Sequence, residues 1–80
     1  MTLKEAIIQR ILNLCDEHEL TINKLSTVCG MTQSTINNIV NGRNKSTTTS
    51  TVKKICDGLN ITIADFFDDP LFRDLEQEIK

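Results

Sequence analysis

The fold is decided by the stretch LTINKLSTVCGMTQSTINNIVNG, residues 20–42. Within it, Thr21 and Thr32 each precede a short segment whose apolar residues recur at helical spacing, and threonine is a favoured N-cap residue. Gly30 lies between the two segments and suits the left-handed backbone conformation that ends many helices. The stretch therefore predicts two short helices joined by a tight turn, with the second helix running to about Asn41.

The packing positions of these two helices follow the geometry of a helix-turn-helix. Ser26 is small at the point where the second helix should cross the first, and Gly30 makes the turn. The remaining positions are apolar and should face inward; they are Leu25, Cys29, Met31, Ile36 and Ile39. Together these residues match the apolar, small and glycine positions of a DNA-binding helix-turn-helix.

The second helix has a polar side without any charge. At about 100° per residue, the apolar residues Ile36, Ile39 and Val40 fall on one arc. The opposite arc carries only amides and hydroxyls, those of Gln33, Ser34, Asn37, Asn38 and Asn41. Stronger helix formers would suit a merely solvated face better, although a solvated face is the alternative interpretation. Amides and hydroxyls both donate and accept hydrogen bonds, so this arc is suited to reading base edges.

Charge is unevenly distributed along the chain, although the net charge is only −2. Residues 20–56 contain five bases and no acid, whereas residues 57–80 contain seven acids and two bases. A central segment without carboxylates is what a polyanionic partner requires, because the local potential governs docking. Chance clustering in a short chain is the other explanation.

Composition predicts one small soluble domain. The chain has 80 residues, of which 39% are hydrophobic, and no apolar run approaches the roughly 20 residues that span a bilayer. The N-terminus, MTLKEAIIQR, carries charges where a secretory signal would be hydrophobic. We therefore expect a cytoplasmic protein without a membrane segment.

No metal, cofactor or catalytic site is predicted. Cys15, Cys29 and Cys56 are far apart and outside any CxxC pattern, and His18 is the only histidine. These thiols are expected to be reduced core fillers. The Asp68-Asp69 pair is interpreted as a helix N-terminal anchor, since a small helical domain offers no cleft for acid–base chemistry. We expect no enzyme activity and no small-molecule ligand.

The flanking segments also read as helices. A first helix is expected over roughly residues 2–18 with Thr2 as its cap, and a fourth should follow Thr48 and stop at Asn60. Thr62 should cap a short fifth helix that contains Phe66 and Phe67, both expected in the core. The fold class is therefore an all-α domain of five helices over residues 1–69.

Residues 70–80 are expected to form a short additional C-terminal helix. Asp69-Pro70 suits a helix start, and an apolar stripe follows, made of Leu71, Phe72, Leu75 and Ile79. This tail either covers the core of its own domain or pairs with its copy across a two-fold axis. We favour the second alternative, a homodimer.

Residues 20–42, followed by TVKKICDGLNITIADFF at residues 51–67, resemble the phage lambda repressor/Cro-type helix-turn-helix domain of the XRE family. The resemblance covers about residues 7–67. It implies the five-helix lambda-repressor-like fold, with the third helix entering the major groove of double-stranded DNA. It also implies a sequence-specific transcriptional regulator, most simply a repressor. A protein-interaction module on the same fold, such as an antitoxin or adaptor, is the alternative.

The resemblance also implies site residues. Base contacts are expected from Gln33, Ser34, Asn37, Asn38 and Asn44. Backbone phosphates are expected to contact Thr21, Asn23, Thr32, Asn41, Arg43 and Lys45.

The chain departs from the family pattern at several positions. Cys15 and Val40 stand where some members place a buried ion pair, so an apolar pair is expected instead, which is often neutral for stability. Ile22 replaces a phosphate-binding glutamine, and Asn23 is the expected substitute. Thr47 and Thr49 stand where a proline and a leucine are common.

Overall fold

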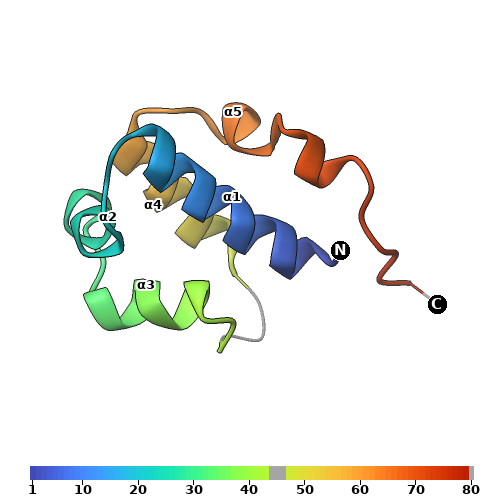
Figure 1. Ribbon diagram of the computed structural model, residues 1–80, viewed down its shortest axis with the longest axis horizontal. Helices are drawn as coiled ribbons and strands as arrows, with labels where there is room; N and C mark the ends of the chain where they lie inside the picture. The colour runs from blue at the N-terminus through green and yellow to red at the C-terminus, as the bar shows by residue number, and fades with distance from the viewer. Residues whose placement is uncertain (44–46, 80) are drawn as a thin grey trace.

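The computed structural model describes residues 1–43 and 47–79, and in this part of the chain every regular element is a helix. The elements are α1 (Leu3–Glu17), α2 (Ile22–Cys29), α3 (Gln33–Val40), α4 (Thr49–Leu59), α5 (Ile63–Phe67) and the 3-10 helix η1 (Pro70–Phe72). Figure 1 shows α1 running between α3 on one side and α5 with the C-terminal segment on the other. No described helix is long and apolar enough to cross a membrane.

Local capping chemistry explains where the helices begin. Each of the five α-helices starts after a threonine whose hydroxyl accepts a hydrogen bond from the backbone N–H three residues later; these are Thr2, Thr21, Thr32, Thr48 and Thr62. Two helices end in the left-handed region, at Gly30 (φ 68°) and Asn60 (φ 58°). All these caps and stops were predicted from the sequence, and the structure confirms them.

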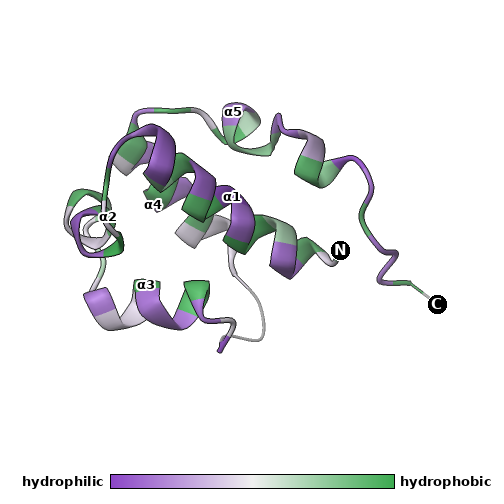
Figure 2. Ribbon diagram, viewed as in Figure 1, coloured by the Kyte–Doolittle hydropathy of each residue, from purple (hydrophilic) through white to green (hydrophobic). Residues whose placement is uncertain are grey.

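The core draws one fully buried large side chain from each α-helix. Ile11, Leu25, Ile36, Ile55 and Phe66 each have 0% of their surface exposed, and they belong to a single apolar cluster. Figure 2 shows apolar residues on the helix sides that face one another. The predicted core positions of α2 and α3 are therefore confirmed, except that Met31 is only half-buried.

The three cysteines are free and buried, as expected of core fillers. Burial raises the pKa of all three thiols, and for Cys29 burial together with the nearby Cys15 and Cys56 raises it to about 11. The thiols are therefore neutral at ordinary pH, and a neutral buried thiol behaves as a small apolar side chain. Among the described residues, no group of histidine, cysteine or acidic side chains could hold a metal ion.

The C-terminal segment corrects the sequence-based prediction of its length. The extra helix is a single 3-10 turn, Pro70–Phe72, in which the Asp69 carboxylate accepts from Leu71 N–H at 3.0 Å. Residues 73–79 are not helical, and Ile79 is 88% exposed. A helix of this length is marginal without a packing partner. Phe72 has such a partner in the core, and Leu75 is half-buried beside Leu3, so Ile79 is the exposed member of the stripe.

That partner is the aromatic cluster at the end of the core. The Phe72 ring lies with its centroid 4.9 Å from that of Phe67 and 6.1 Å from that of Phe66. Phe66 is fully buried, whereas Phe67 is half-buried and packs against the outside of the core. The start of the tail therefore covers the core of its own domain.

Arg10 is a buried charge that the sequence analysis did not single out. Only 8% of the residue is exposed, and its guanidinium donates to Phe66 O at 2.7 Å, Asp65 O at 2.9 Å and the Asp69 carboxylate at 3.2 Å. These bonds join α1 to the end of α5 and the start of η1. The pairing explains how a charge is tolerated inside so small a domain.

Candidate nucleic-acid interface

The turn between α2 and α3 has the close geometry that the sequence predicted. Gly30 leaves α2 in the left-handed conformation, and Met31 N–H returns to Ser26 O at 3.0 Å. The Ser26 side chain is buried and donates to Asn23 O at 2.6 Å, so its hydroxyl is satisfied within α2. A larger residue at this buried position would overpack the domain around α2.

The turn leaves one side of α3 open to solvent. Ile36 and Ile39 point into the core, with 0% and 3% of their surfaces exposed. On the opposite side Gln33, Ser34 and Asn37 are exposed, and Asn38 is half-buried. Figure 1 shows α3 at the edge of the molecule, with no other helix beyond it. The arcs predicted from helical periodicity therefore match the exposed and buried sides.

A side-chain pair links the first residue of α3 to α2. Gln33 Nε2 donates a hydrogen bond to Asn23 Oδ1. A glutamine amide nitrogen carries two hydrogens, so one remains, together with the Oε1 acceptor. That remaining donor–acceptor pair is the arrangement that bonds adenine in the major groove. Asn23 in turn keeps its own amide nitrogen as a donor at the start of α2.

The described residues among the predicted phosphate contacts lie at the starts of α2 and α3 and directly after α3. Thr21, Asn23, Thr32 and Asn41 are exposed, as is Arg43, which follows α3. The hydroxyls of the two threonines accept from Lys24 N–H at 3.1 Å and from Thr35 N–H at 3.2 Å. A hydroxyl that accepts such a bond still has its own proton to donate. Thr32 Oγ1 also lies 2.8 Å from Thr35 Oγ1, where either hydroxyl can be the donor. Asn44 and Lys45 lie outside the described residues.

Comparison with known proteins gives this arrangement a family. The family model described as Cro/C1-type HTH DNA-binding domain matches residues 10–70. The chain belongs to the Cro/C1-type helix-turn-helix family. It is also similar to a solved structure titled "Crystal structure of the prophage Lp1 protein 11", with 36% sequence identity and a TM-score of 0.81. The match covers 94% of this chain and 99% of that one. A search of curated proteins found no match.

Membership of the Cro/C1-type family confirms the fold and supports a DNA-binding role for the domain. Within this fold, the positions of the family ion pair, one late in α1 and the other at the last residue of α3, carry apolar side chains. Cys15 belongs to the buried core and Val40 packs against it. Ile22 also packs against the core, so the first residue of α2 carries no polar group toward DNA. The exposed Asn23 beside it is the nearest polar substitute.

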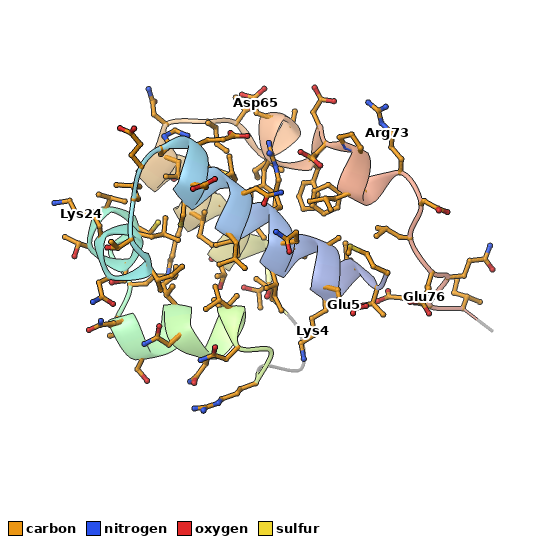
Figure 3. All side chains as sticks on the ribbon, viewed as in Figure 1. Lys4, Glu5, Lys24, Asp65, Arg73 and Glu76 are labelled. Carbon is orange, nitrogen blue, oxygen red and sulfur yellow. The ribbon has the colours of Figure 1, made fainter. Side chains whose placement is uncertain are left out.

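In this Cro/C1-type domain none of the three carboxylates labelled in Figure 3, those of Glu5, Asp65 and Glu76, belongs to α2 or α3. Asp65 is on the far side of α1 from α3, Glu5 is at the start of α1, and Glu76 lies beyond the N-terminal end of α1, next to Met1. The Glu5 carboxylate accepts from Thr2 N–H at 2.8 Å, and this backbone hydrogen bond lowers its pKa. The Glu5 carboxylate is therefore bound at the N-terminal cap of α1. The polar side of α3 meets no acidic side chain of its own or of α2.

Proposed function

We propose that this protein is a sequence-specific transcriptional regulator that inserts α3 into the major groove of double-stranded DNA. The observation that carries the proposal is the exposed, uncharged side of α3, with Gln33 held by Asn23. The width of the major groove admits one α-helix, and its base edges present the donors and acceptors that amides complement. The simplest action of such a domain is repression, since occupying a promoter requires no further surface.

Each predicted site residue has a role in this proposal. Gln33 reads an adenine through its remaining donor and acceptor, and Ser34, Asn37 and Asn38 contact neighbouring bases. Asn44 is assigned to the bases from the sequence alone. The phosphate contacts set register and affinity rather than sequence; they are Thr21, Asn23, Thr32, Asn41, Arg43 and Lys45.

Two substitutions test the proposed base contacts and phosphate contacts independently. On a duplex selected from a random pool by the wild-type protein, we expect Gln33→Ala to weaken binding by about 2 kcal/mol and to leave binding to random DNA unchanged. Arg43→Ala should weaken binding to both and reduce the slope of log Kobs against log salt by about 0.9. Fluorescence anisotropy at several salt concentrations measures both effects.

An equal loss on selected and random DNA for Gln33→Ala would contradict its assignment as a base contact. The alternative function, an antitoxin or adaptor that uses the fold to hold a protein, predicts DNA binding that is absent or insensitive to salt in the same titration. Selection from the random pool therefore distinguishes the two functions before any variant is made.

We further propose that the regulator is a homodimer, since two helix-turn-helix domains related by a two-fold axis read a palindrome. The support is an open hollow beside the start of α1, lined by apolar Leu3, Leu75 and Ile79 together with Glu76 and Glu78. Sedimentation equilibrium should give twice the chain mass, and Ile79→Asp should return the monomer. A monomer at all concentrations would exclude this arrangement.

The buried free thiols favour a reducing compartment, the cytoplasm.

A further inference from the structure

Lys4 comes from the start of α1 but lies against the end of α3. Its Nζ donates a hydrogen bond to Gly42 O at 2.7 Å, across 38 residues of sequence. Gly42 also packs close to α1, because a Cβ at this position would lie 4.0 Å from Lys4 Cε and from Ile8 Cδ1. Figure 3 shows Lys4 pointing from α1 toward the end of α3.

This contact changes the electrostatics at one end of the proposed reading helix. The carboxyl end of an α-helix carries a partial negative charge, which repels phosphate, and a cation placed there offsets it. None of the last residues of α3 is basic. The Lys4 ammonium supplies the missing cation from another helix, at Gly42, the residue immediately before Arg43 in the sequence.

The ammonium keeps donors for an external anion. A lysine ammonium has three N–H donors, and the bond to Gly42 O uses one of them. The ion pairs among residues 1–43 and 47–79 involve the N-terminal amine, Arg10 and Lys53, and none involves Lys4. The adjacent acid, Glu5, is bound to Thr2.

We propose that Lys4 is a phosphate-binding residue of the DNA interface, contributed by α1 at the carboxyl end of α3. The inference rests on the proposed insertion of α3 into the major groove, because a helix in the groove has the phosphates of both strands beside its ends. It adds a third element, α1, to an interface that the sequence analysis confined to the acid-free segment from residue 20 to residue 56.

The test compares Lys4→Met with Arg73→Met on the duplex selected by the wild-type protein. Both variants remove one positive charge, but Arg73 lies on the opposite side of α1 from α3 (Figure 3). We expect Lys4→Met to make the slope of log Kobs against log salt shallower by about 0.9. Arg73→Met should leave the slope unchanged, and Lys4→Arg should restore it. Circular dichroism checks that each variant is folded.

A second measurement locates the contact. Duplexes in which single phosphates are replaced by neutral methylphosphonates should reveal one position that weakens wild-type binding and has no effect on Lys4→Met. Equal slopes for Lys4→Met and Arg73→Met would overturn the inference and leave the proposed function intact. Failure of the wild-type protein to bind any duplex would overturn the proposed function, and the role of Lys4 with it.

Discussion

Replacing Arg10 with methionine should lower the free energy of unfolding by about 3 kcal/mol, because removing one partner of a buried ion pair leaves the other without compensation. The Arg10 and Asp69 side chains are only 9% and 22% exposed. The carbonyls of Asp65 and Phe66 would also lose their charged donor. For a domain of 80 residues this is a large share of the total stability. Urea titration followed by circular dichroism measures it.

Asp69→Asn is the matched control for the arginine. Leu71 N–H and Arg10 Nη1 donate to different oxygens of Asp69, Oδ1 and Oδ2. An asparagine whose oxygen accepts from Leu71 N–H therefore loses the charge and the bond to Arg10, while the guanidinium keeps its two carbonyl acceptors. We expect a cost of about 1 kcal/mol. If Arg10→Met were no more harmful than Asp69→Asn, the guanidinium would not be what fastens α5 and η1 to α1.

Gly58 is the second position where we expect a large effect. It lies within α4, and a Cβ there would lie 2.8 Å from Cys29 Sγ and 2.9 Å from Val28 O. Alanine normally stabilises a helix interior by about 1 kcal/mol relative to glycine. Here Gly58→Ala should instead destabilise the domain by about 2 kcal/mol and Gly58→Val by about 3 kcal/mol, because overpacking forces α2 away from α4. Thermal and urea unfolding give both values.

Two comparisons isolate the steric cause. Gly30→Ala meets nothing within 4 Å but has φ +68°, so its cost of about 1 kcal/mol comes from the backbone alone. Combining Gly58→Ala with Cys29→Ala removes the sulfur and should recover part of the loss, since the Val28 backbone remains. If the single variant Gly58→Ala were more stable than the wild type, α2 and α4 would be able to move apart without an energetic cost, and the steric explanation would be wrong.

Local features of this fold are predictable from the sequence because their causes are local. A threonine before an apolar repeat fixes each helix start, and glycine or asparagine in the left-handed region fixes two helix ends. The amide face of α3 follows from helical periodicity alone. The capping chemistry and the exposed side of α3 therefore match expectation, except that Asn38 is half-buried.

The features that were missed depend on residues distant in sequence. No local pattern says that Arg10 meets Asp69, that Gly58 packs against Val28, or that Lys4 reaches Gly42, because each contact is created by tertiary packing. The predicted C-terminal helix was too long for the same reason. Its apolar stripe was visible in the sequence, but the sequence did not show that the segment after Phe72 lies against the N-terminus without a helix, with Glu76 N–H donating to Met1 O.

Asn23 binds the side-chain amide of Gln33 from a different helix. Any attempt to change the DNA sequence that this domain prefers must therefore treat residues 23 and 33 together. In a library that varies residue 33 alone, most new side chains would lack the amide N–H that donates to Asn23 Oδ1. Changing the preferred base therefore calls for paired codons, one in each helix, and the energetic effects of the two replacements will not add.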